Sequence, residues 1–219
     1  MIKLTSTTLP ARLRVPVVTL ACVALMLALQ YLVRDHSQFY FDQTAISNGD
    51  YWRLLTGHFI HADNAHLRWN LVALLLLGLL LEQHSRTLML AALVGGVFVI
   101  DIWLLSPLAG VSRYCGLSGV LNSVLVLLLW QEWRRHKQWL PVLTGLLALA
   151  KIVVELTAQQ SLFTHFSWPP YPPAHLAGSV AGLILIAVVH HRSHVSRFTT
   201  STSPTSPTSP TSHKQFHAN

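Results

Sequence analysis

The amino-acid sequence predicts an all-α integral membrane protein with a bundle of six transmembrane helices, and three observations lead to this prediction. Hydrophobic residues make up 52% of the 219-residue chain and charged residues only 11%, whereas soluble domains carry about 25% charged residues. Six apolar stretches recur along the chain, several of them short for the roughly 20 residues of a full span. Basic residues gather in alternate loops, as is typical of membrane proteins. We therefore attribute the net charge of +7 to contact with the lipid bilayer, not to a nucleic acid partner.

Each predicted helix follows one apolar stretch. The six ranges are 15–33, 66–81, 88–105, 118–130, 140–157 and 174–190. The first stretch is longer than the apolar core of a signal peptide and precedes no convincing small-residue cleavage site, so we interpret it as a retained membrane helix. Residues 1–14 then form an N-terminal segment, 15–192 the helical domain and 193–219 a Ser/Thr/Pro-rich tail, which we expect to be disordered.

Basic residues predict the orientation of the chain in the membrane. The N-terminal segment, Arg86 and the clusters at 134–137 and 192–197 all lie on one side if six helices alternate. The positive-inside rule makes that side cytoplasmic, with both termini there. The polar interval 34–65, which is rich in aromatic residues as interfacial segments are, then faces outward together with Ser118.

Polar side chains inside the predicted spans are the main functional signal, because such groups are costly in lipid and are usually paired or functional. They are His66, Asn70, Asp101, Ser118, Asn122, Lys151, Glu155 and His175. Lys151 and Glu155 are four residues apart, so we expect them to pair along one helix face. Asp101 has no role that the sequence indicates.

Three of these groups fall at one predicted depth. With a rise of about 1.5 Å per residue, Asn70, Ser118 and His175 each lie about 18–22 Å above the cytoplasmic end of their helix. In a hydrocarbon core of about 30 Å, that places an amide, a hydroxyl and an imidazole some 8–12 Å below the outer face. Scattered structural polar residues have little reason to coincide in this way.

Ser118 has two interpretations when it is taken alone. It lies between Gly116 and Gly119 at the start of a predicted helix, where a serine is commonly an N-cap, and where it can also be a nucleophile if a base lies nearby. His175 shares one helix face with Gly178 and Gly182. This GxxxG pair permits close helix contact of a generic kind, and it brings His175 against Ser118 if the partner is the helix at 118–130.

A metal site is disfavoured by the ligand spacing. His58, His61 and His66 form a cluster, but no His-Glu-x-x-His or comparable ligand set is present. Cys22 and Cys115 form neither a disulfide framework nor a metal pattern. We therefore expect no metal and no cofactor.

Together these residues resemble the rhomboid family of intramembrane serine proteases. The motifs are Trp52-Arg53, His61-x4-His66-x3-Asn70, Gly78 and Glu82 on the second predicted helix, Gly116-Leu117-Ser118-Gly119, and Ala174-His175-Leu176-Ala177-Gly178 with Gly182. The resemblance covers about residues 13–192. Each motif alone is weak, whereas their combination is highly specific.

The resemblance implies a serine endopeptidase with Ser118 as nucleophile and His175 as general base. No carboxylate that would orient His175 is apparent in the sequence, so a dyad is expected instead of a triad. The resemblance also implies that Asn70, His66 and the Ser118 backbone N–H hold the oxyanion. The supporting residues that it implies are Arg53, His61, Glu82, Gly116, Gly119, Gly178 and Gly182.

The small size of the chain, without an extra domain or a seventh helix, resembles the rhombosortase branch of the family. This resemblance implies a bacterial inner-membrane protease that acts on secreted proteins with a C-terminal membrane tail. Such a tail has a small, Gly-rich stretch, an apolar helix and a basic end, and it is cleaved near the outer face. Asn122 and Ser123 depart from the residues that follow the nucleophile in many relatives.

Three other classes compete with the protease. The first is an inactive rhomboid-like protein that binds membrane proteins or serves in quality control, although the presence of Ser118, His175 and Asn70 argues against it. A transporter predicts internal repeats, which the sequence lacks. A soluble α/β-hydrolase predicts Gly-x-Ser-x-Gly after a strand, which differs from the motif found.

Overall fold

The computed structural model describes residues 14–158, 168 and 171–201, with side chains up to residue 191. Of the predicted N-terminal segment (1–14) and tail (193–219), residues 1–13 and 202–219 lie outside the described residues, whereas 193–201, expected to be disordered, belong to the helix that ends at Ser201. The chain divides into two compact units, Met1–Ile186 and Ala187–Asn219. The first unit holds the helical bundle and the side chains of the site described below.

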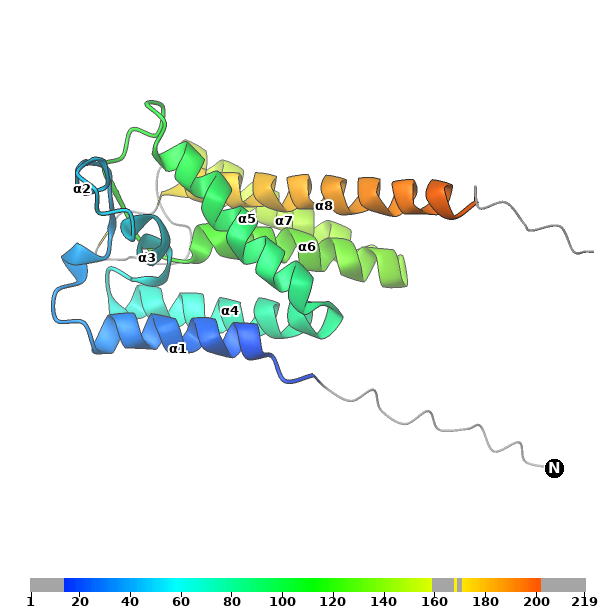
Figure 1. Ribbon diagram of the computed structural model, residues 1–219, viewed down its shortest axis with the longest axis horizontal. Coiled ribbons are helices and arrows are strands. Elements are labelled where there is room, and N and C mark those ends of the chain that lie inside the picture. Colours follow the sequence, from blue (N-terminus) through cyan, green and yellow to red (C-terminus); the bar gives the residue numbers. More distant parts are fainter. Residues whose placement is uncertain (1–13, 159–167, 169–170, 202–219) are drawn as a thin grey trace, which may run out of the picture. The chain divides into compact units, whose positions relative to one another are not determined.

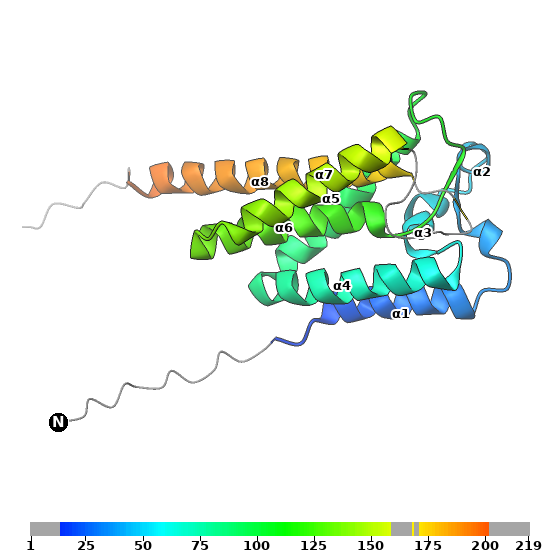
Figure 2. The same ribbon diagram turned by 180° about the vertical axis from the view of Figure 1, so that it is seen from behind.

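The bundle consists of long helices that follow the apolar stretches of the sequence (Figure 1). They are α1 (Val17–Tyr31), α4 (Asn64–His84), α5 (Arg86–Leu104), α6 (Ser118–His136), α7 (Leu140–Ala158) and α8 (Pro172–Ser201). Figure 2 shows the same arrangement from behind, with α1 beside α4 in both views. The prediction of a mainly helical membrane protein is thus confirmed.

Four of these helices are long and apolar enough to cross a membrane. They are α4, α5, α7 and the first 20 residues of α8, while α1 is a shorter apolar helix of 15 residues. Helix α6 is not among them within the described chain, because its last turns carry Glu132, Arg134 and Arg135. Six crossings therefore remain a prediction.

The predicted ends of two helices were wrong, and one of them is α8, which was expected to stop at residue 190 but continues to Ser201. Helix α6 was expected to stop at residue 130, but it continues to His136 and ends where Lys137 adopts the left-handed conformation. Its last turns are stabilised by cations above indole rings, with Arg134 over Trp130 and Lys137 over Trp133. Helix ends that are inferred from apolar stretches leave out the polar residues that extend a membrane helix into the interface.

The polar interval 34–65 folds into short elements at one end of the bundle (Figure 1). It contains η1 (His36–Gln38), β1 (Phe41–Asp42), α2 (Gln43–Ser47) and α3 (Arg53–Phe59). The carboxylates of Asp35, Asp42 and Asp63 accept backbone N–H groups at the starts of η1, α2 and α4. Three of the acidic residues in this interval are therefore N-caps.

A two-residue strand pair joins this interval to the loop before α6. Strand β2 (Arg113–Tyr114) pairs antiparallel with β1, so that Phe41 lies opposite Tyr114. The Arg113 side chain also donates to the Asp42 carboxylate at 2.8 Å. This small sheet is the one departure from an all-α fold among the described residues.

Glu82 joins the ends of α4 and α1. Its carboxylate is fully buried and accepts hydrogen bonds from the backbone N–H groups of Val18 (3.0 Å) and Thr19 (2.9 Å), and from the Thr19 hydroxyl (2.9 Å). The first N–H groups of a helix have no partner within the helix, and they favour a negative charge. Glu82 therefore stabilises the start of α1.

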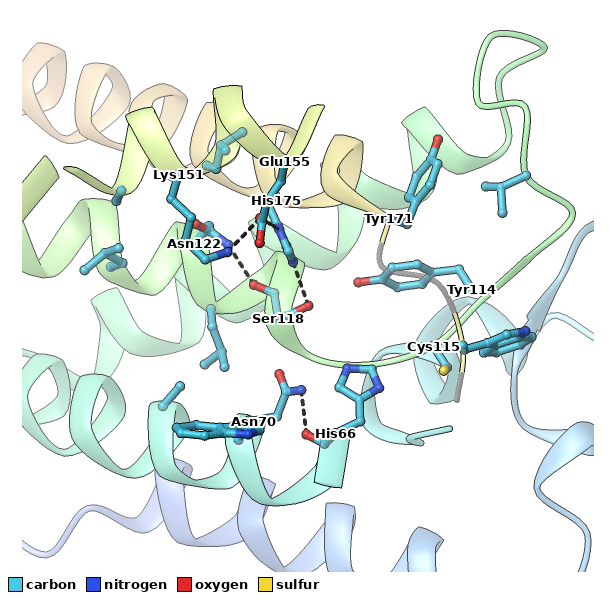
Figure 3. Close-up of a pocket in the computed structure, with 18 of the residues that line it drawn as sticks. His66, Asn70, Tyr114, Cys115, Ser118, Asn122, Lys151, Glu155, Tyr171 and His175 are labelled. Atoms are coloured by element: carbon cyan, nitrogen blue, oxygen red, sulfur yellow. Dashed lines mark hydrogen bonds and ion pairs between the residues drawn. The ribbon is translucent and has the colours of Figure 1, made fainter. Parts of the chain in front are cut away.

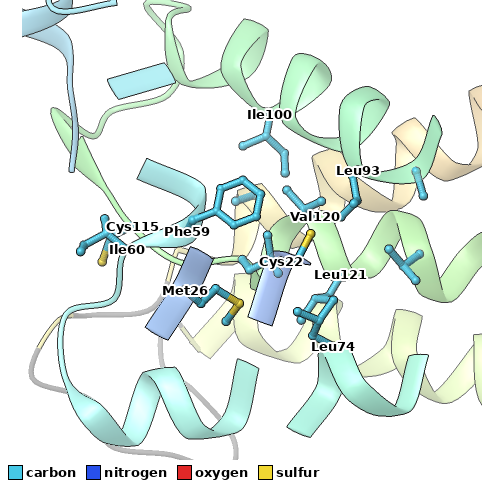
Figure 4. Packing of buried hydrophobic residues seen from close by; sticks show 14 of the residues in the cluster. Cys22, Met26, Phe59, Ile60, Leu74, Leu93, Ile100, Cys115, Val120 and Leu121 are labelled. Carbon is cyan, nitrogen blue, oxygen red and sulfur yellow. The ribbon is translucent and has the colours of Figure 1, made fainter. Parts of the chain in front are cut away.

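The apolar core lies between α1, α4, α5 and α6. Met26, Leu74, Ile100 and Val120 come from these four helices and are all fully buried (Figure 4). Many leucines and valines on the outer faces of the same helices remain exposed, as expected for side chains that face lipid.

Two glycines of α8 allow it to pack closely on α6. A Cβ atom on Gly178 would collide with the backbone carbonyl of Gly119, and one on Gly182 would lie 2.7 Å from the Cβ of Val126. The GxxxG face of α8 therefore packs on α6, which is the partner that brings His175 toward Ser118.

This contact leads to a first prediction. We expect Gly178→Ala to lower the thermal unfolding midpoint of the purified protein in detergent, because the added methyl group meets a rigid backbone carbonyl and overpacking costs about 1–3 kcal/mol. Gly145→Ala is the matched control, since its added Cβ would meet only Leu129 at 3.6 Å. Equal midpoints for the two variants would contradict the role given to Gly178.

Candidate active site

The loop that places Ser118 requires glycine at position 116. Gly116 has φ +107°, and its N–H donates to the carbonyl of Gly57 at 2.9 Å. A Cβ on Gly116 would lie 2.5 Å from the ring of His66. The chain can therefore pass His66 and enter α6 at Ser118 only because residue 116 has no side chain.

The hydroxyl of Ser118 faces His175 instead of capping its helix. Leu117 occupies the N-cap position and makes no side-chain cap. The Ser118 Oγ lies 3.0 Å from the Nε2 of His175, near the start of α8 (Figure 3). This is the distance of a nucleophile and its base within hydrogen-bond reach.

A carboxylate lies on the other side of His175, which the sequence analysis did not anticipate. The Oε2 of Glu155 on α7 is 3.4 Å from the Nδ1 of His175 (Figure 3). The expectation that no carboxylate faces His175 was therefore wrong. A sequence separation of 20 residues, on a different helix, conceals this proximity.

Lys151 and Glu155 form the ion pair that their spacing predicted. The Lys151 Nζ donates to the Glu155 Oε2 at 2.7 Å, one helical turn apart on α7. Only 1% of the Glu155 side chain is exposed, against 38% for Lys151. The pair thus consists of a buried carboxylate and a half-exposed ammonium group.

Asn70 and His66 lie on α4, across the cavity from Ser118 (Figure 3). The Asn70 side chain is 4% exposed, and its Nδ2 donates to the backbone carbonyl of His66 at 3.0 Å. The Asn70 Oδ1 has no hydrogen-bond partner within the described part of the chain. An amide and an imidazole are thus available beside the hydroxyl.

Two other predicted supporting residues, Arg53 and His61, make contacts within the interval 34–65 and with the start of α4. Arg53 donates to the backbone carbonyls of Ser37 (2.7 Å) and Tyr40 (3.1 Å) and pairs with Asp50. The ring of His61 is fully buried and packs edge-on against His66, with ring centres 4.9 Å apart.

Asp101, for which the sequence indicated no role, pairs with a histidine of α3. Its Oδ1 lies 3.0 Å from the Nε2 of His58, a ring that is completely buried. The two side chains join α3 to α5 inside the bundle. This is how a lone acidic residue in an apolar helix is satisfied.

A cavity of about 900 Å³ opens beside Ser118. Its polar part contains Ser118, His175, Glu155, Asn70 and His66, and its aromatic rim contains Tyr114, Trp168 and Tyr171. Its apolar walls are Ala73 and Leu77 of α4, Leu121 and Leu125 of α6, and Ala148 and Ile152 of α7. The reactive groups therefore lie at one end of a trench between α4 and α7.

Aromatic residues of the rim were missed by the sequence analysis. Tyr171 accepts a hydrogen bond from the indole N–H of Trp103 (2.8 Å) and donates to the carbonyl of Ala109 (2.6 Å). Tyr114 donates to the carbonyl of Gly116 at 2.9 Å. The position of Tyr114 just before the Gly-x-Ser-Gly motif was the one available signal.

The cysteines play no visible part in this chemistry. Cys22 and Cys115 are both free and buried. Burial raises the pKa of the Cys115 thiol to about 12, so this group is protonated at neutral pH. The described residues contain no cluster of three side chains suited to a metal ion.

Comparison with known families identifies the class of protein. The rhomboid domain model matches residues 48–192, which include every polar residue of the cavity. The chain belongs to the rhomboid family, whose members are generally intramembrane serine proteases that act on membrane proteins. A search of curated protein sequences finds no match.

The buried ring of His61 leads to a prediction about pH. Burial, with the neighbouring His66, lowers the pKa of His61 to about 3, whereas the unfolded chain has the ordinary value of about 6.5. The unfolded chain therefore binds more protons between these values, and stability falls as the pH drops below about 6.5. At pH 5 the loss is about 2 kcal/mol.

The measurement is the thermal unfolding midpoint in detergent at pH 7.5 and pH 5.0. We expect His61→Gln to reduce the difference between the two midpoints. His191→Gln, at an exposed side chain, should keep the difference of the natural protein, because an exposed ring is solvated in both states. An unchanged difference in His61→Gln would contradict the role given to His61.

Proposed function

We propose that this protein is an active intramembrane serine endopeptidase in which Ser118 is the nucleophile and His175 the general base. The observation that carries the proposal is the distance of 3.0 Å between Ser118 Oγ and His175 Nε2, at the polar end of a large cavity. Membership of the rhomboid family supports it. Both groups are buried or half-buried at the starts of rigid helices, which fixes their geometry.

The chemistry proceeds in two steps. The Nε2 of His175 takes the proton of Ser118 as the Oγ attacks the peptide carbonyl carbon, and it returns this proton to the leaving amine when the C–N bond breaks. A water molecule then attacks the acyl ester and gives a proton to His175, which passes it to the Ser118 oxygen. The products are a new C-terminal carboxylate and the free hydroxyl.

The tetrahedral oxyanion needs hydrogen-bond donors in a site with little water. We assign this role to the Ser118 backbone N–H, the Asn70 amide and His66. The backbone N–H lies at the first turn of α6, where donors have no partner within the helix and where negative charge is favoured. Asn70 and His66 line the facing wall of the same cavity.

The shape of the cavity indicates the substrate class. Its apolar walls between α4 and α7 suit a membrane-embedded segment, and its polar end suits a backbone that has left the helical conformation. A helix must unwind to present a carbonyl to Ser118, and glycine lowers the cost of unwinding. We therefore propose a Gly-rich C-terminal membrane tail of a secreted protein, as in the rhombosortase branch.

We further propose six crossings, with the Ser118 end facing outward and the basic end in the cytoplasm of a bacterial cell. Arg86 donates to the carbonyl of Val15 at 2.7 Å, and His84 lies 2.6 Å from Glu132. The basic ends of α1, α4, α5 and α6 are thus neighbours. This arrangement supports one common basic side.

The first test is labelling by a fluorophosphonate probe of the purified full-length protein. We expect the natural protein to be labelled and both Ser118→Ala and His175→Ala to lose labelling, because the first lacks the nucleophile and the second lacks the base. Asn70→Ala should slow the reaction by about 10²–10³-fold through loss of an oxyanion donor. Absence of labelling in a folded natural protein would favour an inactive member of the family.

The second test concerns the substrate. We expect co-expression with reporter proteins that carry a Gly-rich, apolar and basic C-terminal tail to yield a shortened reporter, detected by mass spectrometry. Ser118→Ala is the control for the protease, and a tail whose glycines are replaced by leucine is the control for the substrate. Cleavage of both tails, or of neither by a protein that is labelled by the probe, would contradict the assigned branch.

A further inference from the structure

We infer that Glu155 is a positioning residue of this active site, so that Lys151, Glu155, His175 and Ser118 form one connected chain and the site is a Ser–His–Glu triad. The inference rests on the proposed function and adds to it a residue that acts through His175. It also makes α7, which contributes no reacting atom, necessary for catalysis.

The contacts run without interruption from α7 through α8 to α6. Lys151 Nζ is 2.7 Å from Glu155 Oε2, which is 3.4 Å from His175 Nδ1. On the far side of the same ring, His175 Nε2 is 3.0 Å from Ser118 Oγ. Figure 3 shows the four side chains in this order along the cavity wall.

The His175 Nδ1 atom is buried and makes no hydrogen bond to any described residue. A ring nitrogen in this position needs an acceptor for its proton, and the Glu155 carboxylate is the group beside it. The distance of 3.4 Å exceeds that of a good hydrogen bond by a few tenths of an ångström. Catalytic hydrogen bonds are commonly this long before substrate is bound.

The burial of Glu155 indicates that its carboxylate does more than form an ion pair with Lys151. An ion pair that merely stabilised the surface of α7 would have both partners exposed, but only 1% of the Glu155 side chain is accessible. The carboxylate points into the bundle, toward His175, while Lys151 stays half-exposed. Burying a carboxylate is costly, and a catalytic role explains why the chain keeps it there.

The carboxylate also determines the tautomer of the base. A negative oxygen beside Nδ1 favours the imidazole that carries its proton on Nδ1, which leaves Nε2 free to accept the proton of Ser118. As His175 becomes positively charged during attack, the same carboxylate stabilises that charge. Glu155 therefore assists the step that makes the nucleophile, and it itself exchanges no proton.

Helix α7 packs on α6, and its buried side chains lie in the turn that carries Glu155. Among its described residues only Ile152 and Glu155 are buried, whereas α6 buries seven residues. The buried turn of the helix that carries the third member is thus the turn where Glu155 meets His175. The orientation of the base consequently depends on α7 being seated against α8.

The experiment measures labelling kinetics of the purified full-length protein with a fluorophosphonate, which separates the inactivation rate kinact from the binding constant KI. We expect Glu155→Gln to lower kinact by about 10²–10⁴-fold with KI unchanged, as for loss of the carboxylate in other triads. Glu155→Asp, which keeps the charge, should restore part of the rate. Lys151→Gln should lower kinact by less than about tenfold, because Glu155 still faces His175.

The decisive control is the double variant Lys151→Met/Glu155→Leu, which replaces the pair by apolar side chains and leaves no unpaired charge. We expect it to keep the unfolding midpoint of the natural protein and to react as slowly as Glu155→Gln. If the folded double variant is labelled within about threefold of the natural rate, or if Lys151→Gln is as slow as Glu155→Gln, the pair is purely structural and the inference is wrong.

The test also separates this inference from the proposed function. If the natural protein is labelled at Ser118 and Glu155→Gln is labelled at a similar rate, the triad is wrong and the proposed protease function still stands. A folded natural protein that is not labelled overturns the protease, and the triad with it. If Glu155→Gln does not fold, the double variant alone decides the outcome.

Discussion

The contact between the backbones of α6 and α8 is the constraint on which the rest of the site depends. Gly178 touches the carbonyl of Gly119, and no larger residue fits at either position without displacing a helix. This close approach places the first turn of α8 against the first turn of α6, where His175 meets Ser118. In a membrane, where the hydrophobic effect does not drive helices together, such packing of small residues is the available source of precision.

The elements of the interval 34–65 hold the loop before Ser118 from the other side. Strand β1 pairs with β2, the Gly57 carbonyl accepts the N–H of Gly116, and the ring of His66 lies under that glycine. The first two contacts link the interval 34–65 to the residues just before Ser118, and the third links α4 to them. The hydrogen bonds and the contact of the His66 ring with the Gly116 backbone together fix the conformation of the loop that enters α6.

Several polar groups within the bundle are satisfied by a group from another helix or turn. His58 meets Asp101, Glu82 caps α1, and Ser123 donates to the carbonyl of Ala92 at 2.6 Å. Glu155 likewise has a partner on another helix, His175 of α8, in addition to Lys151 on its own helix. This cluster lines the cavity of about 900 Å³ beside Ser118, whereas the three other groups do not line it.

The sequence by itself determined the class of the fold and the starts of the helices to within two residues. That the polar groups Asn70, Ser118 and His175 lie at one depth in the membrane stays a prediction. Apolar stretches indicate which segments lie in lipid, and a rise of about 1.5 Å per residue converts the position of a residue along its helix into a depth in the membrane. It did not reveal the neighbours of those groups across the bundle. The meeting of Glu155 with His175, the pairing of His58 with Asp101 and the rim formed by Tyr114 and Tyr171 were decided only by the tertiary structure. Such contacts depend on the rotation of each helix about its axis, and packing against other helices sets that rotation.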